Sequence, residues 1–327
     1  MKKIFFLTLL ALFTFMGKTY AQNHLVATLD HEGTVSVFTG KDAFINAHEA
    51  AIDGDVITLS SGEFNATEIT KAISLYGAGV LPYDSSTRLS STDSLEIKTP
   101  LSTTKELLVE GIRFPTNTTS YDLNNATFRK CIFYYFTYRG GENGAEFIHC
   151  RFDYGLKNFA GHAVLMNCFV HDMYNLSTDT TYYTCFNCII VPCYYNDSYT
   201  SLYNSIFTNS ILYAYRSHTF DGSNSLFSCL LYESLSTYIV IERSSLMTFY
   251  PISDIFKSWR GGTPAREEDF KLTDEAKTTY IGNDGTEVGI YGGAMPYNPT
   301  PSVPRIKSFR MDAKPSEGIL KADVEVE

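Results

Sequence analysis

The sequence predicts an all-β fold in which short strands stack into a parallel β-solenoid. Between residues 124 and 234, a phrase of the form apolar-x-x-small-x-apolar recurs at intervals of 18 to 22 residues. The phrases are rich in Phe, Ile, Val and Tyr, which favours strands, and no helix-length apolar pattern lies between them. One such unit cannot bury its own apolar face, whereas stacked units can. The central small residues are Cys131, Cys150, Cys168, Cys188, Ser210 and Cys229.

Each phrase also indicates which side chains point inward. Side chains alternate along a strand, so the central small residue and the large apolar residue two places later share a face, which we assign to the interior. The residue before each centre is then a bend, because Asn is frequent there and tolerates a left-handed backbone. About 19 residues per turn leave room for two or three short strands, with successive turns about 4.8 Å apart. The expected bend residues are Lys130, His149, Asn167, Asn187, Asn209 and Ser228.

Two further stretches carry a family resemblance. The segments AIDGDVITLSSGEF (51–64) and ITKAISLYGAG (69–79) resemble the first turns of secreted bacterial members of the pectin-lyase-like superfamily. The segment DGTEVGIYGG (284–293) resembles their closing turn. The resemblance implies a right-handed, single-stranded parallel β-helix over roughly residues 40–293. It implies much less about activity, because one fold hosts many functions.

The chain begins with a targeting pattern. Lys2 and Lys3 precede an apolar run at residues 4–16, and Ala21 ends a small-residue cleavage site. This pattern predicts a signal peptide over residues 1–21. The alternative, a membrane anchor, is disfavoured because the apolar run is short for a membrane span. We therefore expect a secreted, cell-surface or periplasmic protein whose mature chain begins at Gln22.

The mature chain is then divided into a solenoid, residues 22–295, and a tail, residues 296–327. Residues 24–38 predict an initial strand or strand pair. Residues 40–52 predict a helix, with Phe44, Ala47, Ala51 and Ile52 on its apolar face, that covers the open first turn. Its start would be capped by Thr39 or Gly40.

The later segments are less regular. Residues 55–79 predict the opening turns, and the polar residues 80–106 predict a long loop or irregular turns. Residues 235–260 predict one more turn, and residues 261–280 a polar loop with a short helix near Thr273. The tail predicts a proline-rich linker, residues 296–304, and a β-hairpin.

Charge limits the partners. Residues 1–21 contain three lysines, so the mature chain keeps 36 acidic and 23 basic residues, a formal charge of −13. This charge disfavours nucleic acid and anionic membrane surfaces as partners. We expect a monomer without a cofactor or metal, with Ca²⁺ relevant only if the protein is a lyase.

The seven cysteines predict buried thiols. Five of them occupy the column of central residues, and side chains at equivalent positions of adjacent turns point the same way, which is unfavourable for disulfide geometry. Free cysteine is readily buried as a small apolar residue. Cys185 and Cys193 lie outside the column, so one disulfide bridge involving them is the remaining alternative. Cys185-x-x-Cys188 has ligand-like spacing, but a single pair is weak evidence for a metal site.

A tyrosine-rich side is the expected binding surface. Stacking converts equal sequence offsets into columns, and aromatic rings offer the flat apolar faces and hydroxyl groups that a sugar requires. An exposed column of rings would bind an extended glycan; the alternative is that the rings only fill space between turns. The expected ligand-binding residues are Tyr134, Tyr154, Tyr174, Tyr213 and Tyr232.

Catalysis is the second hypothesis. Asp153 and His171 share an offset on adjacent turns, so they are weak candidates for an acid–base pair, with a surface ion pair as the alternative. A polysaccharide lyase would also need cations or Ca²⁺ to stabilise charge beside a uronate. The candidates are scattered, so we favour a non-catalytic glycan- or partner-binding protein over a lyase or glycoside hydrolase; a structural or adhesive spacer is the third reading. The candidate cations are Arg139, Arg151, Lys157 and Arg216, and the candidate Ca²⁺ ligands are Asp153, Asp172, Asp179 and Asp197.

Overall fold

The computed structural model divides the chain into two compact units, Leu25–Arg305 and the remainder, which are described separately. The predicted signal peptide, residues 1–21, lies outside the described residues. The described residues are 25–80, 90–92, 95–98, 104–121, 123–140, 144–158, 160–175, 181–191, 205–213, 225–232, 246–248, 252–260, 265, 268–300, 302, 306–311 and 322–326.

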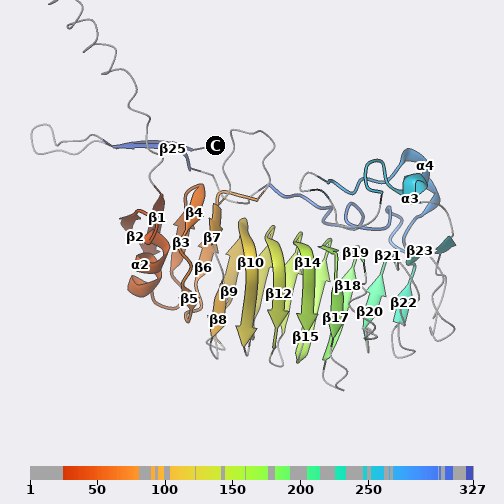
Figure 1. The fold of residues 1–327 in the computed structure, drawn as a ribbon, viewed down its shortest axis with the longest axis horizontal. Helices are drawn as coiled ribbons and strands as arrows, with labels where there is room; N and C mark the ends of the chain where they lie inside the picture. The colour runs from red at the N-terminus through yellow and green to blue at the C-terminus, as the bar shows by residue number, and fades with distance from the viewer. Residues whose placement is uncertain are drawn as a thin grey trace, which may run out of the picture. The chain divides into compact units, whose positions relative to one another are not determined.

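The larger unit is a β-solenoid built from two long sheets, as predicted (Figure 1). The first, sheet A, runs in the order β2-β1-β3-β6-β9-β11-β13-β15-β18-β20-β22 and is parallel from β3 onward. Its strands are β1 Val26–His31, β2 Thr34–Thr39, β3 Val56–Leu59, β6 Ser74–Tyr76, β9 Leu107–Glu110, β11 Ala126–Arg129, β13 Ala145–Ile148, β15 Gly161–Met166, β18 Thr181–Phe186, β20 Ile206–Thr208 and β22 Ser225–Phe227.

The second sheet, sheet B, forms the other wall of each turn and pairs its strands in parallel. Its main path is β4 Gly62–Phe64, β7 Ser90–Thr92, β10 Ile112–Tyr121, β12 Ile132–Tyr138, β14 Arg151–Asn158, β16 Phe169–Val170, β19 Ile189–Ile190, β21 Ile211–Tyr213, β23 Leu230–Tyr232 and β24 Leu246–Thr248. The short strands β5 Glu68–Ile69, β8 Glu96–Lys98 and β17 Met173–Asn175 pair beside this path. Strands β7 and β8 fall within the polar residues 80–106, so part of that segment belongs to the solenoid wall.

The register confirms the inward assignment. Phe133 of β12 lies opposite Phe152 of β14, and their rings stack with centroids 5.1 Å apart. Phe128 and Phe147 stack in the same way in sheet A, at 5.2 Å. All four rings are fully buried. Equivalent side chains of successive turns therefore build continuous ladders through the interior.

The predicted bends are also confirmed. All six residues before the central positions have φ between 49° and 54°, the left-handed region. Asn adopts this region more readily than most residues, which explains its frequency there. The bend turns the chain from sheet A into sheet B.

The central cysteines are free and buried, as expected. The thiol of Cys168 donates to the carbonyl of Phe147, 3.2 Å away in the preceding turn, and approaches that of Met166 at 3.4 Å. The other four cysteines of the column repeat this arrangement, and Ser210 donates to Thr208. Cys185 is also free and buried, whereas Cys193 lies outside the described residues.

At the N-terminal end, β1 pairs antiparallel with β2, and helix α2, Ala43–Ala50, packs against both. The helix lies within the predicted range, and Phe44 and Ala47 are buried as expected. Two details of the prediction were wrong. The N-cap is Asp42, which makes no side-chain capping bond, rather than Thr39 or Gly40. Ile52 is 56% exposed because the helix ends at Ala50 and the chain leaves the helical phase.

Residues 252–297 form a cover that the sequence analysis did not anticipate. It contains helix α3, Ile252–Ile255, and helix α4, Asp274–Thr279, whose N-cap is Thr273, close to the predicted short helix. The cover buries a second apolar core with the outward residues of sheet B. Those outward residues are Phe169, Ile189, Val191, Ile211 and Leu230, and the cover contributes Ile252, Ile255, Phe256, Trp259, Phe270, Leu272, Ala276, Tyr280, Val288 and Ile290.

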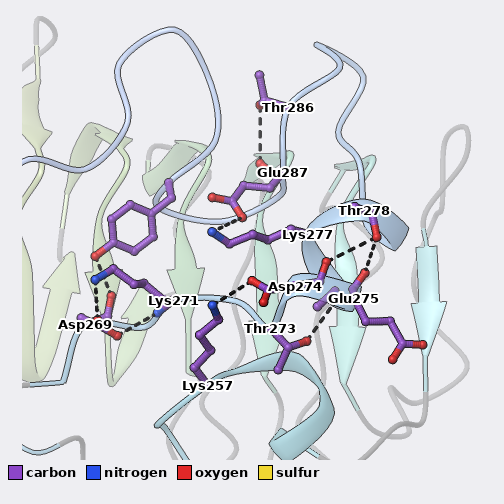
Figure 2. Close-up of polar contacts among 12 residues, drawn as sticks. Lys257, Asp269, Lys271, Thr273, Asp274, Glu275, Lys277, Thr278, Thr286 and Glu287 are labelled. Carbon is purple, nitrogen blue, oxygen red and sulfur yellow. Dashed lines mark hydrogen bonds and ion pairs between the residues drawn. The ribbon is translucent and has the colours of Figure 1, made fainter.

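Polar contacts hold the cover together (Figure 2). Lys257 pairs with Asp274 at 2.8 Å, and Lys271 pairs with Asp269 at 2.9 Å. Thr273 accepts a hydrogen bond from the backbone N–H of Ala276 and donates one to the carbonyl of Asp254. These contacts close the loop between the two short helices.

The last part of the cover continues into a strap, residues 281–302, which runs back along the bends between sheets A and B. In Figure 1 this blue segment passes from the region of α4 toward β10. The strap bonds to four of the six bend residues in reverse order. It continues past the predicted end of the solenoid at residue 295 into the predicted linker. The contacts are Asn283 and Gly289 with Asn209, Ile290 and Gly292 with Asn167, Met295 with His149, Thr300 and Ser302 with Lys130, and Ser302 with Glu110.

The smaller unit contains an antiparallel hairpin of β25, Ile306–Met311, and β26, Ala322–Val326. No helix in the described part of the chain is both long and apolar enough to span a membrane.

Candidate functional site

The tyrosine side begins where strands β12 and β14 bend. The register between them shifts after Phe133, which displaces Tyr134 and Tyr154 from the regular alternation. Both side chains lie on the surface, 39% and 44% exposed. Their rings face each other from adjacent turns, with centroids 4.2 Å apart and planes inclined by 36°. We call Tyr134 and Tyr154 the tyrosine pair.

A cation and a glycine shape the surface beside the pair. The ammonium group of Lys157 lies 4.9 Å from the ring centroid of Tyr135, and burial lowers the pKa of this lysine. A Cβ atom on Gly155 would lie 2.7 Å from the Tyr135 ring and 3.2 Å from the Asp172 carbonyl. Only glycine therefore allows Tyr135 to lie this close to the next turn.

Asp153 and His171 take different partners. Asp153 accepts from the guanidinium of Arg151 at 2.5 Å, and Nδ1 of His171 lies 2.9 Å from a carboxylate oxygen of Asp172. The structure thus places the two candidates on adjacent turns but pairs each with a neighbour in its own turn. Asp153 and His171 therefore do not form the acid–base pair that their shared offset suggested.

The side chain of Arg151 is used in structural contacts. It is almost fully buried and donates to the carbonyl of Ala265 at 2.8 Å. Its guanidinium also lies 5.6 Å from the ring centroid of Phe270 in the cover. This candidate cation therefore anchors the cover to β14. The other lyase candidates Arg216, Asp179 and Asp197 lie outside the described residues.

The remaining predicted tyrosines are placed by their backbone only. Tyr174 pairs with Lys157 in the register of β17 and β14, and Tyr213 pairs with Tyr232 in that of β21 and β23. Their side chains lie outside the described part of the structure. Val191, at the same offset as Tyr134, is buried under the cover, so the predicted column is interrupted there.

Sheet A presents rings that the sequence analysis missed. Tyr182 is 38% exposed, and its ring stacks on that of His162 with centroids 4.3 Å apart. Nε2 of His162 lies 3.0 Å from the hydroxyl of Thr184, and Phe186 is also exposed. The detectable signal was the alternation within β18, where Tyr183 and Cys185 point inward and Tyr182, Thr184 and Phe186 outward.

Metal binding has no support among the described side chains, where no group of three His, Cys, Asp or Glu residues has a suitable arrangement. Against known proteins, no family model, no curated protein and no solved structure matches this chain.

Proposed function

We propose that this chain is an exported, non-catalytic β-helix protein of the pectin-lyase-like type, from a bacterium, that binds an extracellular glycan through the tyrosine pair. The signal pattern at residues 1–21 supports export, and the solenoid supports the fold assignment. The observation that carries the binding proposal is the exposed, stacked arrangement of Tyr134 and Tyr154.

The rigidity of the pair favours binding. Both rings project from strands whose neighbouring residues, Phe133 and Phe152, are locked in the interior ladder. Little side-chain freedom is therefore left to lose when a sugar ring settles on them. Their hydroxyl groups supply the hydrogen bonds that orient a polar ligand on an apolar ring face.

The charges near the pair favour a neutral glycan. Asp153 lies within β14 beside the tyrosine pair, Asp172 lies between β16 and β17 in the next turn, and Arg151 is already paired with Asp153. The mature chain has a formal charge of −13. An acidic polymer would meet repulsion at this surface, whereas a neutral one would not.

The test uses the mature chain against a panel of neutral and acidic polysaccharides, following both retention and release of reducing or unsaturated ends. We expect retention on a neutral polymer without product. Tyr134→Ala combined with Tyr154→Ala should weaken retention about thirtyfold, since the two ring contacts contribute about 1 kcal/mol each.

Tyr182→Ala is the matched control, because it removes an equally exposed ring from the other sheet. Its retention should equal that of the unmodified chain. Product release would overturn the proposal in favour of a lyase or hydrolase. Retention that survives the double substitution would show that the tyrosine pair is not the site.

A further inference from the structure

Strand β2 leaves one edge of sheet A open. It is the terminal strand in the sheet order, and β1 is its only partner among the described strands. Val35 and Val37 are 59% and 54% exposed, the two highest values among the exposed large apolar residues apart from Ile52. An edge strand carries a row of unpaired backbone donors and acceptors that another strand can use.

The open backbone groups can be identified from which residue pairs of β1 and β2 are hydrogen-bonded. The N–H of Gly40 donates to the carbonyl of Leu25 at 2.9 Å, and the register from Val26–Thr39 to His31–Thr34 is continuous. Hydrogen-bonded and non-hydrogen-bonded pairs alternate in an antiparallel ladder. Ser36 and Phe38 therefore direct their backbone groups toward β1. The backbone groups of Val35, Val37 and Thr39 point toward the open edge.

Strand β2 lacks the residues that usually prevent pairing at a sheet edge. Its sequence, Thr-Val-Ser-Val-Phe-Thr, contains no charged residue and no proline, which are the usual devices that prevent edge pairing. In a protein of net charge −13, an uncharged strand is also where two copies repel each other least. The exposed charged residues just beyond its two ends are Glu32 at one end and Lys41 and Asp42 at the other.

We propose that β2 pairs antiparallel with β2 of a second copy, about a two-fold axis through Val37. In this register Val37 lies opposite Val37 of the copy, and Val35 lies opposite Thr39 of the copy. All three outward residues then exchange backbone hydrogen bonds. The antiparallel direction also brings the Glu32 end of one strand to the end of the other that carries Lys41 and Asp42, where Lys41 offsets part of the negative charge.

The pairing yields a closed dimer. A two-fold contact uses the same surface on both copies and leaves no β2 edge free for a third. It continues the antiparallel order β2-β1-β3 without a break, joining the two sheets A at their N-terminal ends. This inference replaces the monomer expected from the sequence.

The experiment measures the molar mass of the mature chain, with any affinity tag removed, by sedimentation and light scattering over a range of concentrations. We expect a dimer for the unmodified chain. Val37→Lys should be monomeric, because two like charges would face each other across the axis. Val37→Pro should also be monomeric, because it removes an outward N–H that β1 does not use. Ile52→Lys, at an equally exposed apolar residue, is the control and should remain dimeric.

A cross-link tests the register directly. Val37→Cys places two thiols opposite each other, where hydrogen-bonded partners have Cα atoms about 5.5 Å apart, within disulfide range. Mild oxidation should then cross-link Val37→Cys but not Val35→Cys. Circular dichroism at low concentration checks that each variant is folded.

Several results would overturn the inference. A monomeric unmodified chain or oligomers that grow without limit would exclude a closed dimer. A dimer that survives both Val37 substitutions, or one that Ile52→Lys also dissociates, would place the contact elsewhere. Cross-linking of Val35→Cys as efficient as that of Val37→Cys would exclude the register.

Discussion

At the scale of single residues, each turn depends on one left-handed bend followed by one small interior side chain. The bend residue does more than turn the chain. Asn167, with φ of 51°, donates from its side chain to the carbonyls of Ile290 and Gly292, at 2.9 and 2.8 Å. Asn209 also binds the strap, because its side-chain oxygen accepts from the N–H of Asn283 at 3.0 Å.

Three substitutions at Asn167 separate its backbone role from its side-chain role. Asn167→Ala should destabilise by roughly 2–4 kcal/mol, because it strains the left-handed backbone and removes two buried hydrogen bonds. The Ile290 carbonyl keeps the bond from the N–H of Tyr297, so the Gly292 carbonyl bears most of the loss. Asn167→Gly should cost about 1 kcal/mol less, because only the hydrogen bonds are lost. Asn167→Asp keeps the shape but cannot donate, so it should destabilise at least as much as glycine does. Urea unfolding measures all three; an aspartate variant as stable as the original would contradict the hydrogen-bond assignment.

At the scale of elements, the solenoid is covered on two sides by segments that the repeat does not contain. The cover, residues 252–297, buries the outward face of sheet B, where the residue after each central position is apolar in five of six turns. Helix α2 packs at the N-terminal end, where His48 accepts from the N–H of Thr70 at 3.3 Å. Both elements protect apolar surface that a free solenoid would expose.

The packing of α2 should depend on pH through His48. Burial, together with the smaller effect of the nearby Lys71 charge, lowers the pKa of His48 from 6.5 to about 4. The unfolded chain takes up this proton first, so the contribution of His48 is fully present above pH 6.5 and is lost as the pH falls toward 4.

His48→Gln keeps an acceptor for Thr70 but does not titrate. Between neutral pH and pH 4.5 it should therefore lose roughly 1–3 kcal/mol less stability than the unmodified chain. Urea unfolding at the two pH values gives both differences. Equal acid sensitivity of the two proteins would show that His48 does not bear this cost.

At the scale of the whole molecule, the strap changes how the turns depend on one another. In a simple solenoid each turn contacts only its neighbours, so the ends can open independently. The strap bonds to turns that lie far apart, from Glu110 to Asn209. It therefore links the stability of the central turns to the docking of the residues after α4.

Gly292→Ala tests this coupling. A Cβ atom there would lie 1.7 Å from the carbonyl oxygen of Glu287 and 2.8 Å from the Asn187 amide, so the strap must shift. We expect a loss of about 1–3 kcal/mol. Hydrogen exchange should show reduced protection in residues 281–302 and at the bends, with the inner strands still protected.

Gly285→Ala is the control, because nothing lies within 4 Å of its Cβ position and only its positive φ of 79° opposes the change. Its cost should be about 1 kcal/mol and should stay local. Reduced protection confined to residue 292 and its neighbours would mean that the strap does not couple the turns.

The candidate site was predicted only in part. Equal offsets place Asp153 beside Tyr134, and the register shift after Phe133 brings Tyr154 there instead. The predicted column also does not continue, because Val191 lies beneath the cover. The rings of sheet A at Tyr182 and Phe186 were missed, since the columns were counted only after each central residue and both rings precede Cys188. Offsets predict neighbours only while the register is regular, and bulges such as that after Phe133 shift them.

The sequence by itself determined the solenoid, the inward face, the bends and the buried thiols, because these depend on a local repeat in which each turn meets an identical neighbour. The tertiary structure alone decided the partners of Asp153 and His171, the second core under the cover and the path of the strap. The contacts of the strap join residues more than a hundred positions apart, such as Asn167 and Gly292. No local period encodes them, because they form only when a non-repeating segment folds back onto a surface that the finished stack creates.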